Sequence, residues 1–222
     1  MNSAKSPSAL VTAFRARLIR REALDELLSC VIFAVASLLI FAVLSIFGQA
    51  RQMHSFGILR IVFLSYVGMI LLLAILVRRG WWHPALRFVN TALQITVLSA
   101  FLFAISRERG PSFALTTALP MLYCLVISMT AFRLSPWLSF FAGALAAAEL
   151  VYLYAFVMLP RLTPEMLAAN PALGWPAVFA RVVVLFAIGA ACAFAAGSLR
   201  RQMEKQAADH TRIQLLERTF GS

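Results

Sequence analysis

Residues 176–198 have the sequence PAVFARVVVLFAIGAACAFAAGS, and residues 199–222 continue it with LRRQMEKQAADHTRIQLLERTFGS. The first stretch is apolar and long enough to cross a bilayer, which takes about 20 residues in a helix. The second stretch is charged and rich in helix-forming residues, with no Gly or Pro between Ser198 and Phe220. Together they predict one continuous helix that crosses a membrane and extends into the aqueous phase.

The composition of the whole chain supports a membrane protein. Hydrophobic residues make up 62% of the 222 residues, and charged residues make up only 13%. A soluble domain carries about 25% charged residues, so the composition excludes that class. The net charge of +11 does not indicate nucleic-acid binding. Lys and Arg lie at the ends of apolar runs, where membrane topology and lipid headgroups require them, so we expect no nucleic-acid partner.

The apolar runs predict an all-α fold, a polytopic membrane bundle of six spans with a cytoplasmic C-terminal helix. Short connections make successive helices antiparallel neighbours. Pro120 is expected to kink the fourth span because proline removes a helix hydrogen bond. The predicted spans are Leu27–Phe47, Ile58–Val77, Ala85–Ile105, Phe113–Phe132, Trp137–Leu159 and Ala177–Ser198.

Three parts of the chain are expected to differ in role. Residues 1–26 form a cytoplasmic N-terminal segment with a basic amphipathic helix from Ala9 to Glu26, which either lies on the membrane surface or contacts the C-terminal helix. Residues 27–198 form the bundle, and residues 199–222 form the cytoplasmic helix. Fourteen of the twenty Lys and Arg residues then lie on one side. This asymmetry places both termini on the cytoplasmic side of the membrane.

Glu149 lies near the middle of the fifth predicted span, in GALAAAELVYLYAF. An ionised carboxylate at that depth is costly, so it must be neutral, paired or placed at a cavity. Arg181, about one turn into the sixth predicted span, is the expected partner because these spans are sequence neighbours. Two roles stay open for this pair: a structural contact that fixes helix register, and a sensor of a ligand or ion.

Asn90 and Gln94 are spaced by four residues on the third predicted span, and they share one helix face. Interhelical hydrogen bonding is the simpler interpretation of this spacing, and a polar pocket in the bundle core is the alternative. No nucleophile–base pair, carboxylate dyad or phosphate-binding glycine loop occurs in residues 1–222. We therefore assign no catalytic, cofactor-binding or metal-binding residue to this chain.

Gly189, Ala193 and Gly197 form a ladder of small residues on the sixth predicted span. Small residues at this spacing let helix backbones approach closely. The ladder predicts packing of this span on its copy across a two-fold axis, and a close contact inside one subunit is the alternative.

The charged helix beyond Ser198 repeats apolar residues at steps of mostly three or four. This spacing indicates a weak parallel coiled coil of two chains, and a single solvated helix is the alternative. A homodimer in the lipid bilayer is therefore expected. The residues assigned to its contact are Met203, His210, Ile213 and Phe220, with Gln206 as a further polar position.

The ending IQLLERTFG, residues 213–221, resembles the junction that precedes the catalytic domain of bacterial class III adenylate cyclases. In that family a membrane domain of six spans is followed by a short helix, and the catalytic domain opens with a phrase close to FGRYVSPEV. Phe220 and Gly221 match this phrase, and Ser222 departs from it.

The resemblance implies that this chain is the membrane anchor and sensor region of such a cyclase, placed in a bacterial inner membrane. Residues around Ala207–Thr219 would be the transducer element, and the catalytic domain would be fused after Ser222. That domain, and not residues 1–222, would bind ATP and a divalent metal and form cAMP. Two other interpretations stay open: the sensor region of a histidine kinase or diguanylate cyclase, and a small transporter or channel.

Overall fold

The computed structural model describes residues 56–79, 83–117 and 119–220, together with ten helical positions between residues 24 and 42. Nearly all of the expected N-terminal helix and much of the first expected span lie outside the described residues. Gly221, Ser222 and the side chains of residues 207–220 also lie outside them.

Every secondary-structure element in the described ranges is helical, as the apolar runs predict. The α-helices are α2 (Phe56–Arg78), α3 (Ala85–Arg109), α4 (Pro111–Thr116), α5 (Leu119–Ala131), α6 (Pro136–Leu153), α7 (Pro164–Ala169) and α8 (Trp175–Phe220). A π-helical turn over Tyr154–Met158 and a 3-10 turn over Leu159–Arg161 extend α6, and a second 3-10 turn over Pro171–Leu173 precedes α8.

Three helical segments are long and apolar enough to cross a membrane: Ala85–Arg109, Pro136–Arg161 and Trp175–Gln206. The searched residues of α2 and α5 contribute shorter apolar stretches, Leu64–Leu73 and Pro120–Ala131. The membrane character expected from the composition is thus supported by three helices, and the count of six spans stays a prediction.

The fourth expected span is broken rather than kinked. Helix α4 ends at Thr116, Thr117 has an extended backbone, and α5 begins at Leu119. Pro120 explains the break, because it has no N–H for the Thr116 carbonyl and its ring would clash with that carbonyl in a continuous helix. The hydroxyl of Thr117 donates to the Ala114 carbonyl at 3.0 Å, and that of Thr116 donates to the Ser112 carbonyl at 2.9 Å. These bonds occupy carbonyls at the open end of α4.

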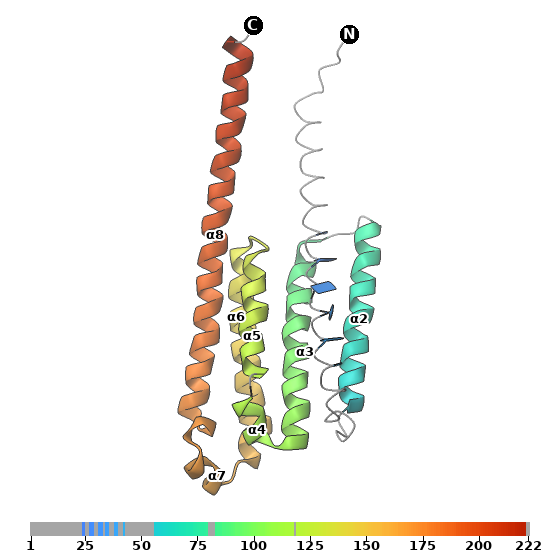
Figure 1. The fold of residues 1–222 in the computed structure, drawn as a ribbon, viewed down its shortest axis with the longest axis vertical. Helices are drawn as coiled ribbons and strands as arrows, with labels where there is room; N and C mark the ends of the chain where they lie inside the picture. Colours follow the sequence, from blue (N-terminus) through green and yellow to red (C-terminus); the bar gives the residue numbers. More distant parts are fainter. Residues whose placement is uncertain are drawn as a thin grey trace.

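Helix α8 is a single helix of 46 residues, as the absence of a breaker after Ser198 predicts. It packs mainly on α6 and also on α5. Figure 1 shows α8 passing beyond the ends of α5 and α6, on the side of the bundle away from α7. The helix therefore connects the bundle directly to a region outside it.

The contact between α6 and α8 is closest at Gly143 and Gly189. A Cβ atom placed on Gly143 would lie 2.8 Å from the Gly189 Cα, and one placed on Gly189 would lie 2.8 Å from the Gly143 Cα. A Cβ on Gly197 would lie 3.4 Å from Pro136 Cγ. Gly189 and Gly197 of the small-residue ladder therefore face α6 of the same chain, which is the alternative interpretation of the ladder. Packing of α8 on a second copy stays a prediction.

The loop between α6 and α8 is held against the bundle. The Tyr154 hydroxyl donates to the Leu173 carbonyl at 2.8 Å, and the Tyr154 and Trp175 rings meet edge to face with centroids 4.7 Å apart. Leu173 and Leu162 are buried. These contacts fix the point at which α8 begins, and with it the position of Arg181.

Candidate functional site

Glu149 lies near the middle of the membrane-length segment Pro136–Arg161. Its carboxylate accepts hydrogen bonds from the Thr96 hydroxyl at 2.7 Å and from the Ser99 hydroxyl. The Ser99 oxygen also lies 2.6 Å from the Tyr123 hydroxyl. Because the single Ser99 proton goes to Glu149, Tyr123 donates to Ser99. We call Thr96, Ser99, Tyr123 and Glu149 the polar cluster.

The side chains of the polar cluster connect helices α3, α5 and α6. Thr96 and Ser99 are three residues apart on α3, so both face the same neighbour. Tyr123 comes from α5 and is 1% exposed, and Glu149 comes from α6. Hydroxyl donors reduce the cost of a carboxylate in an apolar environment without supplying a positive charge.

The expected pair between Glu149 and Arg181 is not formed. Arg181 Nη2 lies 3.5 Å from the Ala172 carbonyl, to which it donates a long hydrogen bond. Arg181 Nη1 is buried and has no hydrogen-bond partner among the described residues. Successive helix residues point about 100° apart. Glu149 faces its donors on α3, and its neighbour Leu150 lies on the side of α6 near Arg181.

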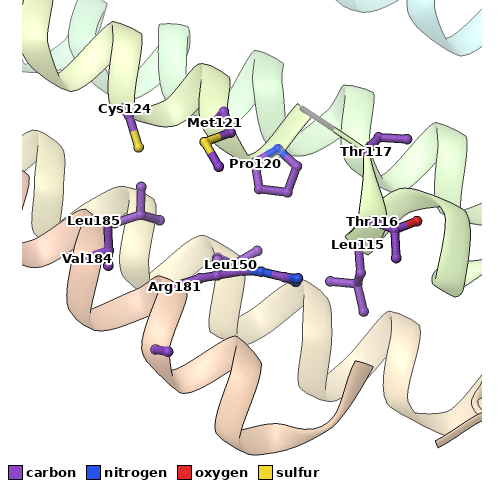
Figure 2. Close-up of a pocket in the computed structure, with 11 residues that line it drawn as sticks. Leu115, Thr116, Thr117, Pro120, Met121, Cys124, Leu150, Arg181, Val184 and Leu185 are labelled. Carbon is purple, nitrogen blue, oxygen red and sulfur yellow. The ribbon is translucent and has the colours of Figure 1, made fainter. Parts of the chain in front are cut away.

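Arg181 lines a pocket of about 320 Å³, which we call the Arg181 pocket. The pocket lies between the end of α4, the start of α5, Leu150 of α6 and the first turns of α8. Figure 2 shows the Arg181 guanidinium extending past Leu150 toward Leu115, into the space beside the helix break. Among the described residues that line it, Arg181 carries the only charge.

The polar cluster and the Arg181 pocket lie on different faces of the same two helices, α5 and α6. On α5, Tyr123 belongs to the cluster and the next residue, Cys124, lines the pocket. On α6, Glu149 belongs to the cluster and the next residue, Leu150, lines the pocket. A shift of α5 or α6 therefore changes both sites together.

Asn90 and Gln94 are both buried. The Gln94 amide donates to the Tyr66 hydroxyl at 3.3 Å, which links α3 to α2. This is the interhelical hydrogen bond that the simpler interpretation of their spacing expects. Neighbouring Thr91 accepts from Arg133 Nη1 at 2.7 Å.

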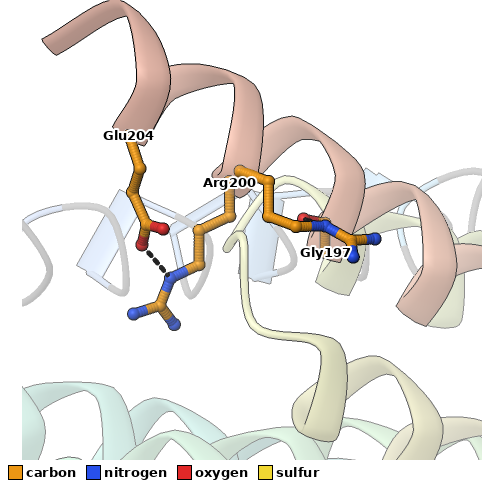
Figure 3. A network of polar contacts seen from close by, with 4 residues as sticks. Gly197, Arg200 and Glu204 are labelled. Atoms are coloured by element: carbon orange, nitrogen blue, oxygen red, sulfur yellow. Dashed lines mark hydrogen bonds and ion pairs between the residues drawn. The ribbon is translucent and has the colours of Figure 1, made fainter. Parts of the chain in front are cut away.

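The part of α8 beyond the bundle is exposed as far as its side chains are described. Met203 is 50% exposed. Arg200 Nε donates to Glu204 at 3.0 Å, and Arg201 Nε donates to the Gly197 carbonyl at 3.2 Å (Figure 3). The other residues assigned to the coiled coil, His210, Ile213 and Phe220, have side chains outside the described part, so the contact between two chains stays a prediction.

Thr96, Ser99 and Tyr123 were not among the sequence-predicted site residues. Two hydroxyls three residues apart, in a span that also carries Asn90 and Gln94, were the available signal. The Arg181 pocket had a weaker signal, since its walls come from four helices.

Among the described residues, no group of three His, Cys, Asp or Glu side chains could hold a metal ion. Comparison of the chain with protein-family models, with curated proteins and with solved structures finds no match.

Proposed function

We propose that this chain is the membrane anchor and sensor region of a signalling protein, and that α8 carries the signal out of the bundle. The observation that supports this most is the continuity of α8. One helix runs from Trp175, beside the Arg181 pocket, through the close contact at Gly189, to Phe220.

The proposed mechanism is a movement of α8 relative to α6. A change in the Arg181 pocket acts on the first turns of α8, because Arg181, Val184 and Leu185 line it. An uninterrupted helix transmits a rotation or a shift along its length. The contact at Gly143 and Gly189 allows no bulk between the helices, so α8 moves by rotating or sliding there and not by bending around a side chain.

The proposed output is the catalytic domain of a class III adenylate cyclase, fused after Ser222 and working as a homodimer. The ending IQLLERTFG supports this assignment by its resemblance to the family junction. In that arrangement the ATP and the divalent metal belong to the fused domain. The relative rotation of two α8 helices would set the geometry of the catalytic dimer.

Insertions in α8 test the proposal. The chain is joined at Ser222 to the catalytic domain of a class III cyclase, and cAMP formation is measured in membranes from cells lacking their own cyclase. Two alanines inserted after Lys205 rotate the output by about 200°, and seven restore the phase to within about 20°. We expect the two-alanine insertion to change the rate and the seven-alanine insertion to return it.

Equal rates for both insertions would show that α8 is a tether without a signalling role. A histidine kinase or diguanylate cyclase is the alternative output. Sequencing the gene beyond codon 222 distinguishes these outputs, because a cyclase domain carries metal-binding aspartates soon after the junction.

A second candidate function is a small transporter, which the break between α4 and α5 favours. Broken helices beside a charged residue bind substrates in several transporter folds. Transporters of that kind pair two broken helices, and in the described ranges only α4 and α5 show such a break within an expected span. Substrate flux into vesicles containing the chain would favour this alternative over the sensor.

A further inference from the structure

Arg181 belongs to the membrane-length segment Trp175–Gln206 and carries a positive charge. Among the described residues no carboxylate pairs with it, and Glu149 is bonded to hydroxyls of the polar cluster. The Nη1 group is buried without a hydrogen-bond partner, although the pocket lies directly beside Arg181. An unpaired charge in an apolar environment is costly, so the site is electrostatically complementary to an anion.

The other residues that line the pocket also favour a ligand that accepts hydrogen bonds from Arg181. Thr116 and Thr117 contribute hydroxyls, but both donate their protons to carbonyls of α4. Arg181 is therefore the strong side-chain donor that faces the pocket among the described residues. The remaining walls are mostly apolar, including Leu115, Leu150 and Leu185. A ligand that fits must accept hydrogen bonds at one end and be apolar at the other.

The pocket opens sideways, toward the surface that lipid chains would cover. Met121 and Val184 line it and are 72% and 51% exposed. Both lie on apolar stretches of α5 and α8, and they are not part of a loop. Its volume of about 320 Å³ is at the lower end of ligand sites, which range from about 300 to 1,000 Å³. It has room for a headgroup and the first methylenes, with the rest of a chain left in the bilayer.

We propose that the Arg181 pocket binds a single-chain anionic amphiphile that arrives from the bilayer. Its carboxylate or phosphate group accepts hydrogen bonds from Arg181, and its alkyl chain leaves between α5 and α8. Occupation neutralises Arg181 and inserts a wedge between the helix break and the first turns of α8. Its role as the stimulus rests on the proposed sensor function, whereas the binding itself does not.

Binding is measured on the full chain in nanodiscs of zwitterionic lipid, corrected for partition into empty nanodiscs. The probes are radiolabelled dodecanoate, dodecyl phosphate and dodecanol. We expect saturable binding of one or both anions and none of dodecanol, without competition from inorganic phosphate or acetate. Arg181→Gln should weaken binding by about tenfold to a hundredfold, the range for a charge-assisted hydrogen bond. Arg181→Lys should retain part of it.

Two further variants separate binding from damage to the fold. Arg161→Gln removes an exposed arginine that lies outside the pocket lining, where the loop between α6 and α8 begins. This variant should bind like the wild type. Val184→Trp places bulk at the exposed mouth of the pocket, keeps Arg181 and should block the anion. Equal binding of dodecanol, unchanged binding by Arg181→Gln, or displacement by inorganic phosphate would each overturn the proposed site.

A separate measurement tests the link to signalling. Cross-linking of Gln206→Cys between subunits is compared with and without dodecanoate. A change that disappears in Arg181→Gln supports both the site and the sensor function. Arg181-dependent binding with unchanged cross-linking supports the site and counts against the sensor function alone.

Discussion

At Glu149 the sequence predicts the need for a partner but does not identify it. Its depth in an apolar run requires a partner. The partners are the Thr96 and Ser99 hydroxyls of α3, and not the arginine on the next span. Hydroxyl donors hold the carboxylate in place while leaving it without a counter-charge, so this residue is sensitive to the loss of any one donor.

Double-mutant cycles at the residue scale distinguish these partners. Ser99→Ala should lower the free energy of unfolding by about 1–3 kcal/mol, because it leaves one Glu149 carboxylate oxygen without its donor and the buried Tyr123 hydroxyl without its acceptor. Combined with Glu149→Leu, the two effects should be non-additive by about 0.5–3 kcal/mol. The measurement is reversible unfolding in mixed detergent micelles.

The matched control is the pair Glu149→Leu and Arg181→Leu. These residues share no partner, so their effects should add to within about 0.5 kcal/mol. Coupling between Glu149 and Arg181 larger than that between Glu149 and Ser99 would contradict the hydrogen bonds described for the polar cluster.

Helices α6 and α8 form the central pair of elements, because Gly143 and Gly189 bring their backbones into contact. In a membrane such packing supplies association energy that the hydrophobic effect does not. The same two helices carry Leu150 and Arg181 of the Arg181 pocket. The glycine contact therefore fixes the position of one wall of the pocket relative to another.

Alanine substitution tests this contact at the scale of the element. Gly143→Ala or Gly189→Ala should cost about 1–3 kcal/mol of stability, because the new methyl group meets backbone atoms that cannot turn aside. Gly68→Ala is the control, since a Cβ there has no atom within 4 Å. Thermal unfolding in detergent measures all three, and equal melting temperatures would show that α6 and α8 are not in close contact.

The molecule as a whole is asymmetric in how its membrane-length helices are covered. The apolar windows of α3 and α6 are each 44% buried, and that of α8 is 17% buried. Most of α8 within the bundle therefore faces outward, toward lipid or a second subunit.

Reporter fusions test the topology of the whole molecule. The distribution of Lys and Arg predicts cytoplasmic signals after Gly80 and after Ser222, and an external signal after Gly110. Alkaline phosphatase and a fluorescent protein, active on opposite sides, measure both outcomes at each position. An external signal at Ser222 would contradict six spans and would remove the cytoplasmic output of α8.

The sequence by itself determined the features that depend on neighbouring residues. Apolar runs specified the helical class, the absence of Gly and Pro after Ser198 specified a continuous α8, and the depth of Glu149 required a partner for it. The number of spans, the dimer and the cyclase output stay predictions.

Only the tertiary structure decided which surfaces meet. Thr96 and Glu149 are 53 residues apart, and their contact depends on how α3 and α6 are rotated about their axes. The same rotation turns Leu150, and not Glu149, toward Arg181. It also directs Gly189 to Gly143 of its own chain. Helical periodicity groups residues on a face, but the facing helix is chosen by the packing of the whole bundle.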